Sequence, residues 1–151
     1  MIVEAQITIN SDKATVWKTI TDIRNAAGIF SSIEKIEILH ESPGTLAGLK
    51  WQETRMYFGK PAAIDKWITD AVENEFYKTR AEMDGFIFLT TTTISGNGNS
   101  IQLTSSHETK AKTFIAKIKS FPMIFFRNIL KNAIHKDLED IKSYAEKNSK
   151  S

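Results

Sequence analysis

Cysteine is absent from this chain, so a disulfide framework, a thiolate nucleophile and a cysteine-based zinc site are all excluded. Long apolar runs are absent too, and none is long enough to cross a bilayer. The opening residues, MIVEAQITINSD, lack the basic start and continuous apolar stretch of a signal peptide. Together these absences predict a protein that works in a reducing, cytoplasmic compartment.

Net charge is small as well, +2 at neutral pH, and by itself indicates neither a nucleic-acid nor a membrane partner. The seven glycines form no phosphate-binding loop between a strand and a helix, so no nucleotide cofactor is expected. Lysine and arginine are nevertheless concentrated between residues 110 and 150. We interpret this concentration as the solvated side of a helix, with a surface for anionic lipid or nucleic acid as the alternative.

The composition supports one folded domain with its own core, because the chain is 41% hydrophobic and 25% charged over 151 residues. No internal repeat, low-complexity tract or linker divides it. Residues 1–151 are therefore expected to form a single domain.

The sequence opens with a strand followed by a helix. Hydrophobic and polar residues alternate over residues 2–9, the pattern of a half-buried strand. Asn10 or Ser11 is positioned to cap a helix over residues 14–23, where valine and isoleucine recur at helical spacing. Residues 25–33 are expected to form a short second helix or an irregular turn.

Most of the remaining chain is rich in Ile, Thr, Phe, Tyr and Trp, as strands are. Turn sequences with glycine, proline and asparagine separate successive segments, which favours hairpins between sequential neighbours. The pattern predicts a meander of antiparallel strands. These strands are expected over residues 33–41, 48–59, 62–74, 76–84, 86–95 and 100–110.

A long amphipathic helix is expected near the C-terminus, because a hydrophobic stripe recurs there at spacings of three and four residues. The stripe needs a surface to cover, and the inner face of the sheet is the only large apolar surface left. Pro122 must either start this helix or kink a longer one, since its ring does not fit a straight helix interior. The sequence does not decide whether residues 112–121 form a strand or a helix. The stripe consists of Phe126, Leu130, Ile134, Leu138, Ile141 and Ala145.

The order of these elements and several local sequences resemble the START-like or SRPBCC superfamily, which includes the Bet v 1-like proteins. Residues 7–23, ITINSDKATVWKTITDI, resemble its opening strand and capped helix. Residues 48–59, GLKWQETRMYFG, resemble its third strand, and residues 137–146, DLEDIKSYAE, resemble the end of its last helix. The branch that the chain resembles most is the polyketide cyclase/dehydrase-type family of small bacterial proteins.

The resemblance implies the helix-grip fold, an α+β architecture in which a curved antiparallel sheet of about seven strands wraps around a long C-terminal helix. One or two short helices follow the first strand. The resemblance leaves function open, because the superfamily includes lipid carriers, hormone sensors, cyclases, oxygenase domains and chaperone co-activators. The metal centre of the oxygenases has no counterpart, since cysteine is absent and His40, His107 and His135 lie in separate predicted elements.

A binding site in such a fold is expected where a few polar groups stand among aromatic residues in the cavity between sheet and helix. On the strand over residues 48–59, a period of two places Trp51, Glu53, Arg55 and Tyr57 on one face. We favour this face as the inner one, where Glu53 and Arg55 would hold a ligand carbonyl or carboxylate. The alternative is an ion pair on the outer surface.

Further candidate ligand contacts come from other strands. His107 shares a face with Ile101 and Ser105, so an inward orientation would bring its imidazole to a ligand oxygen. The alternative is a strand-end histidine near solvent. Trp67 and Phe88 belong either to the cavity wall or to close-packed core, and the sequence does not separate the two.

The segment SFPMIFFRNIL, residues 120–130, is more apolar than a helix buried on one side requires. We interpret the surplus, which includes Phe121, Phe125 and Ile129, first as a cavity wall or a lid over its mouth. Dimerisation is the second interpretation and contact with a membrane surface the third.

The expected function is non-catalytic binding of a small hydrophobic or amphipathic molecule, such as a lipid, isoprenoid or polyketide-like compound, without metal or cofactor. The alternatives are a cyclase/dehydrase- or hydrolase-type enzyme that uses the same cavity, and a chaperone co-activator-like interaction module. No nucleic-acid partner is expected, no residue is assigned a catalytic role, and the oligomeric state, a homodimer included, is left open. The candidate ligand-binding residues are Trp51, Glu53, Arg55, Tyr57, Trp67, Phe88, His107, Phe121, Phe125 and Ile129.

Overall fold

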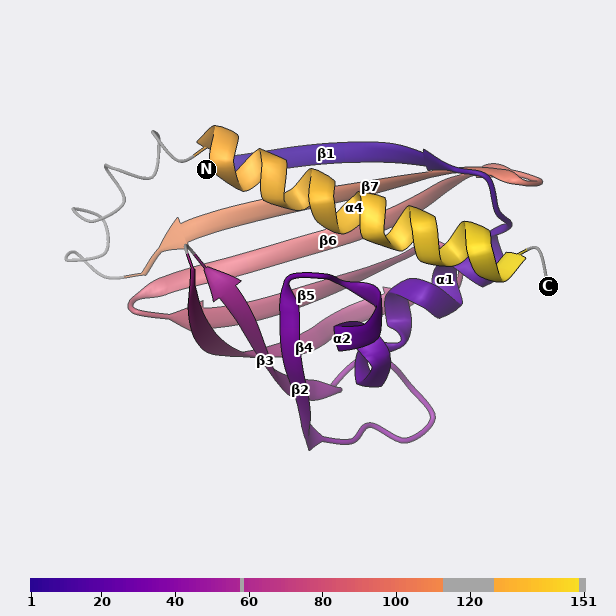
Figure 1. The fold of residues 1–151 in the computed structure, drawn as a ribbon. Helices are drawn as coiled ribbons and strands as arrows, with labels where there is room; N and C mark the ends of the chain where they lie inside the picture. Colours follow the sequence, from indigo (N-terminus) through magenta and orange to yellow (C-terminus); the bar gives the residue numbers. More distant parts are fainter. Residues whose placement is uncertain (58, 113–126, 150–151) are drawn as a thin grey trace.

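The computed structural model describes residues 1–57, 59–112 and 127–149, and for Tyr57 the backbone alone. A seven-stranded antiparallel sheet is combined with a long C-terminal helix and with short helices after the first strand (Figure 1). The predicted α+β helix-grip architecture is confirmed. The elements are β1 (Ile2–Ile9), α1 (Lys13–Thr21), the short helices η1 (Ile23–Asn25) and α2 (Ala26–Ile29), β2 (Ile33–His40), β3 (Lys50–Tyr57), β4 (Lys60–Val72), β5 (Phe76–Met83), β6 (Phe86–Asn97), β7 (Ser100–Ala111) and α4 (Arg127–Ser149).

The sheet runs in the order β1-β7-β6-β5-β4-β3-β2, so strands β2 to β7 form the predicted meander and β1 pairs with β7. The connection between β5 and β6 is a two-residue hairpin, because Met83 pairs with Phe86. Asp84 and Gly85 form its turn with φ values of 51° and 79°, the left-handed conformations that a type I′ turn requires. The residues of this turn are therefore of the kind that the pairing of Met83 with Phe86 requires.

The N-cap of α1 is Asp12, and not the predicted Asn10 or Ser11. The Asp12 carboxylate accepts hydrogen bonds from the backbone N–H of Thr15 at 2.8 Å and from its hydroxyl at 2.9 Å. A carboxylate is favoured there because it also faces the positive end of the helix dipole. The Asn10 backbone N–H instead donates to Glu146 of α4 at 2.8 Å, so this residue joins the end of β1 to the C-terminal helix.

The predicted strand boundaries differ from the observed ones most clearly at β4. This strand begins at Lys60, two residues before the predicted start, and its second residue, Pro61, pairs with Met56. Proline is tolerated in this position because it lies next to the start of the strand. Because β3 ends at Tyr57, the turn before β4 lies two residues earlier than the sequence indicates.

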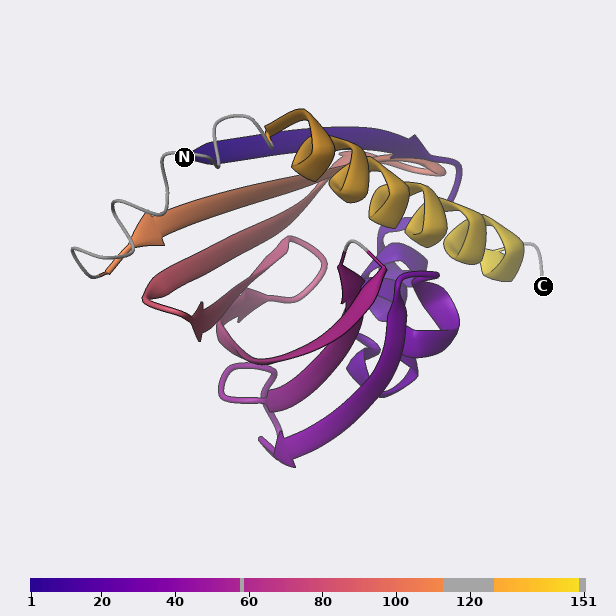
Figure 2. The same ribbon diagram turned by 60° about the vertical axis from the view of Figure 1, so that its left-hand side comes forward.

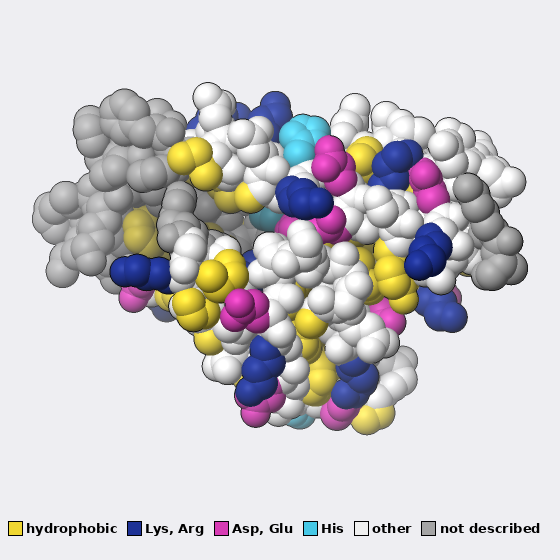
Figure 3. Space-filling view, viewed as in Figure 1, with side chains coloured by type: hydrophobic (Ala, Val, Ile, Leu, Met, Phe, Trp, Pro, Cys, Tyr) yellow, Lys and Arg dark blue, Asp and Glu magenta, His cyan; other side chains and the backbone are white. Residues whose placement is uncertain are grey.

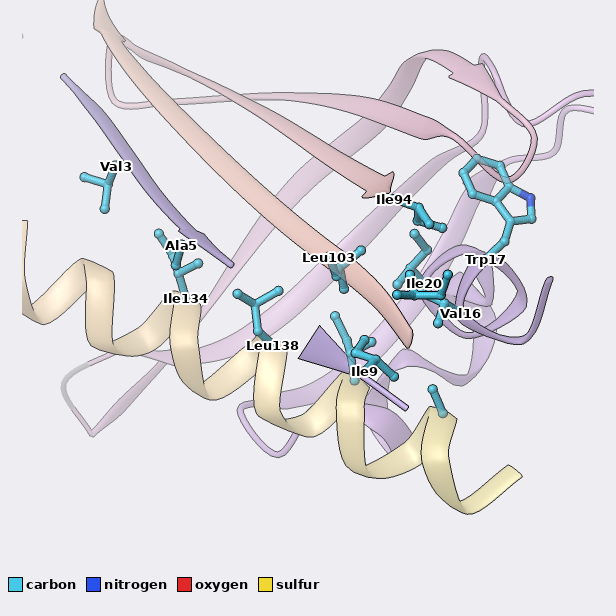
Figure 4. Packing of buried hydrophobic residues seen from close by; sticks show 13 residues of the cluster. Val3, Ala5, Ile9, Val16, Trp17, Ile20, Ile94, Leu103, Ile134 and Leu138 are labelled. Atoms are coloured by element: carbon cyan, nitrogen blue, oxygen red, sulfur yellow. The ribbon is translucent and has the colours of Figure 1, made fainter. Parts of the chain in front are cut away.

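Helix α4 packs chiefly on β1 and on α1, at one side of the curved sheet (Figure 2). Its buried stripe is the predicted one, with Ile134, Leu138, Ile141 and Ala145 each at most 5% exposed. Leu130 is partly buried, whereas Phe126 and Pro122 lie outside the described residues, as does most of the stretch 112–121. The stripe meets a hydrophobic cluster drawn from β1, α1, β6 and β7, including Val3, Ala5, Ile9, Val16, Ile20, Ile94 and Leu103 (Figure 4).

A second and smaller cluster lies toward the other side of the sheet and contains Ile23, Trp51 and Ile68. Its members come from η1, β3 and β4, none of which α4 covers as closely as it covers β1. Residues of both clusters line a cavity between α4 and the sheet. The site described below occupies this region.

Candidate functional site

The inner face of β3 carries a buried carboxylate, Glu53, which is 4% exposed. Its Oε2 accepts hydrogen bonds from Arg55 Nε at 2.6 Å and from Lys66 Nζ at 2.9 Å. Its Oε1 accepts a longer one from the indole N–H of Trp51, at 3.4 Å. Alternation along β3 places Trp51, Glu53 and Arg55 on this face, which is the orientation favoured from the sequence.

Both charges at the centre of this network are held in their ionised forms. Burial alone would raise the pKa of Glu53, but the charges of Lys66 and Arg55 outweigh burial and lower this pKa to about 2. Burial also opposes the positive charge of Arg55, yet Glu53 and Asp137 hold its pKa above the usual value. At neutral pH these side chains are fixed ions and do not titrate.

Arg55 joins the sheet to α4. Its Nη1 lies 2.9 Å from Asp137 Oδ2 and donates to Ser32 Oγ, just before β2, at 2.7 Å. The guanidinium also lies over the ring of Phe30, with 5.6 Å between its carbon and the ring centroid. One side chain thus connects β3, the start of β2 and the C-terminal helix.

His107 of β7 faces the same region. Its Nε2 lies 2.8 Å from Ser105 Oγ, and its Nδ1 lies 3.4 Å from Thr90 Oγ1. Burial, together with the positive charges of Lys66 and Arg55, lowers the pKa of His107 to about 4. The imidazole is therefore neutral at pH 7, with one donor nitrogen and one acceptor nitrogen.

Two adjoining cavities lie between α4 and the sheet. The inner cavity, beside α1 and η1, has a volume of about 90 Å³, and the outer cavity, toward the β5–β6 hairpin, one of about 250 Å³. In the space-filling view a hollow with hydrophobic side chains around it opens beside the N-terminal half of α4 (Figure 3). The residues that line both cavities are Arg55, Lys66, Thr79, Thr90, His107, Ile134 and Asp137. Those that line only the outer cavity are Ile64, Ala81, Met83, Phe88, Leu130 and Ala133.

Five of the predicted contact residues are brought together here. Trp51 and Glu53 line the inner cavity, and Phe88 lines the outer one. Arg55 and His107 line both. These residues come from three strands, β3, β6 and β7, each contributing its inward-facing positions.

Two other predicted contact residues, Trp67 and Ile129, line neither cavity. Trp67 alternates with Lys66 and Ile68, which face inward, so it lies on the outer face, where Lys50 Nζ is 5.7 Å from its ring centroid. Ile129 is 49% exposed, because it lies off the buried stripe of α4. The side chain of Tyr57, and Phe121 and Phe125 altogether, lie outside the described residues.

The sequence reasoning missed Lys66 and Asp137. Lys66 stands between Ile64 and Ile68 with the spacing of two that marks the inner face of β4, and this spacing was the available signal. Asp137 adjoins Leu138 and follows Ile134 by three residues, so it lies at the edge of the helical stripe. Neither signal by itself shows that these two side chains reach Glu53 and Arg55.

Other features of the described chain concern metals and membranes. Across residues 1–57, 59–112 and 127–149, no group of three or more His, Cys, Asp or Glu side chains is placed to hold a metal ion. None of the helices in this part of the chain combines the length and the hydrophobicity needed to cross a membrane.

Solved structures share this architecture over nearly the whole chain. TTHA0849 from Thermus thermophilus superposes with a TM-score of 0.81 and 12% identity, covering 99% of each chain. The Zhui aromatase/cyclase from Streptomyces sp. R1128 superposes with a TM-score of 0.75 and 18% identity, covering 97% of this chain and 93% of its own. A START superfamily protein from Mycobacterium smegmatis superposes with a TM-score of 0.71 and 16% identity, covering 99% of this chain and 97% of its own.

These likenesses confirm that the chain has the START-like helix-grip fold, shared by START superfamily proteins and polyketide aromatase/cyclases. At such low identities they show the fold and not the activity. No protein-family model matches the sequence, and no curated protein matches it either.

Proposed function

We propose that this protein binds a small amphipathic molecule in the two cavities between α4 and the sheet. The proposal rests on how apolar and polar side chains are distributed around the two cavities. The side chains that surround only the outer cavity are apolar, whereas charged and polar ones gather where the two cavities adjoin. A ligand would lie with its apolar part in the outer cavity and its polar end near Lys66, Thr90 and His107.

The cavity volumes set the size of this ligand. The outer cavity, at about 250 Å³, is larger than an engineered cavity of about 150 Å³ that binds benzene. A substituted ring or a short branched chain fits it without rearrangement. A full-length lipid or a polyketide-like molecule requires α4 and the sheet to separate further.

A second candidate function is an enzyme of the cyclase/dehydrase or hydrolase type. The neighbour Zhui is an aromatase/cyclase, and the pair of Ser105 and His107 lines the inner cavity here. Acid–base catalysis works best when a group has a pKa near the working pH. The pKa values of Glu53, about 2, and His107, about 4, lie well below neutrality, which favours binding over catalysis.

The test combines identification of a natural ligand with titration of a defined probe. Native mass spectrometry of the purified protein, followed by organic extraction, should reveal a co-purified molecule of small mass. The probe is prodan, an uncharged naphthalene ketone dye, which should bind saturably at one site. Trp51 lines the inner cavity and serves as the energy donor.

Two neighbouring substitutions provide the matched comparison. Phe88→Ala removes part of the apolar wall, so prodan affinity should fall by about fivefold or more. Leu89→Ala changes the next residue on the outer face of β6 and should leave the affinity unchanged. Absence of saturable binding together with absence of any co-purified molecule would remove the proposed function.

A further inference from the structure

The ammonium group of Lys66 lines both cavities, at the position where they adjoin. Its side chain is 25% exposed, and it donates to Glu53 Oε2 at 2.9 Å. An ammonium group has three donors, and among the described residues Glu53 is the hydrogen-bond acceptor that Lys66 has. Two further donors are therefore available to a bound molecule.

Arg55, the other cation of the site, is fixed in place by three hydrogen bonds. Its Nε donates to Glu53, and its Nη1 donates to both Ser32 and Asp137. These contacts hold the guanidinium between the sheet and α4. Within the described part of the chain, the ammonium group of Lys66 has one such contact, to Glu53, and can turn toward a bound molecule more freely.

The charge around the cavities disfavours an anionic ligand. Where the cavities adjoin, the cations Arg55 and Lys66 are already balanced by the carboxylates of Asp137 and Glu53. A carboxylate head group would find no net positive charge there and would compete with Glu53 for Lys66. An uncharged oxygen acceptor gains the hydrogen bond from Lys66 without desolvating a further charge.

We propose that the ligand of this site is an uncharged molecule with a ketone, ester or amide oxygen, and that Lys66 binds this oxygen. The inference rests on the proposed function and specifies the chemical class of its ligand. The hydroxyl groups of Thr79 and Thr90, which line the same junction, complete the polar end of the site. The rest of the ligand lies against the apolar side chains of the outer cavity.

Three probes share a naphthalene ring and differ only in the head group, so they measure how much the head group contributes to the binding affinity. They are 2-acetylnaphthalene, 2-ethylnaphthalene and 2-naphthoate, titrated by calorimetry at pH 7. The ketone should bind about tenfold more tightly than the ethyl compound, because a hydrogen bond from a charged donor is added. The carboxylate should bind more weakly than the ketone.

Variants of Lys66 test the assignment. Lys66→Met should abolish the advantage of the ketone and leave the affinity for 2-ethylnaphthalene unchanged, which also shows that the variant is folded. Lys66→Arg keeps a charged donor and should restore part of the advantage. Lys60→Met changes an exposed lysine of the same strand and should have no effect.

The outcomes distinguish this inference from the proposed function. Binding of 2-naphthoate as tight as that of the ketone, or a ketone advantage undiminished in Lys66→Met, would overturn the inference and leave the proposed function standing. Failure of all three probes to bind the wild-type protein would overturn the inference, and if prodan binding and a co-purified molecule were absent as well, the proposed function would fall with it.

Discussion

Substitution of Glu53 by glutamine keeps the shape of the side chain and removes the negative charge that Arg55 and Lys66 share. The pKa of Glu53 is about 2 in the folded protein, against an ordinary value of 4.5. This difference corresponds to about 3 kcal/mol of stabilisation at pH 7. Removal of one partner of a buried ion pair typically costs about the same amount. We therefore expect Glu53→Gln to lower the free energy of unfolding by about 3 kcal/mol at pH 7.

The pH dependence provides the stricter part of this test. Because the pKa of Glu53 is lower in the folded state, its stabilisation is fully present above the unfolded value of 4.5 and is lost as the pH falls toward 2. The difference between wild type and variant should shrink to about half by a pH of about 3.

The assay is urea unfolding followed by tryptophan fluorescence, at pH 7 and under progressively more acidic conditions. Glu82→Gln is the control, because Glu82 pairs with Arg80 where both side chains are 36% exposed and the charge is well hydrated. This control should change stability little. A Glu53→Gln variant as stable as wild type at pH 7, or a difference that persists unchanged in acid, would refute the reasoning.

Two further predictions concern the core and His107. Leu138→Asp should prevent folding, because Leu138 is only 1% exposed where α4 packs on the sheet and the new charge would have no partner there. A near wild-type melting curve by circular dichroism would count against this packing. His107 should titrate in NMR spectra near pH 4, since its pKa is lowered from 6.5 to about 4. The unfolded chain takes up this proton first, so stability should fall as the pH drops from 6.5 to 4, and His107→Asn should flatten that slope. An unchanged slope in the variant would assign the effect to another group.

Short-range patterns predicted most of the fold. A period of two identified β1, and strand-forming composition between turn sequences identified the later strands. One of these turns, Asp84-Gly85, closes a hairpin whose backbone needs left-handed conformations. The spacing of three and four residues identified the buried stripe of α4, from Ile134 to Ala145. The N-cap was misplaced because Asn, Ser and Asp stand side by side at residues 10–12 and all three suit that position.

Part of the candidate site could be predicted in the same way. Periodicity alone grouped Trp51, Glu53 and Arg55 on one face, and it placed His107 with Ser105. The same rule applied to β4 would have moved Trp67 to the outer face and Lys66 to the inner one.

The sequence by itself determined which elements form and which side chains share a face, because both follow from spacings within one segment. Only the tertiary structure decided that Lys66 of β4 and Asp137 of α4 reach the pair on β3. Those contacts depend on strand register and on the position of α4 against β1. The protonation states follow from the same contacts, since the pKa of Glu53 depends on charges that are distant along the chain and adjacent in space.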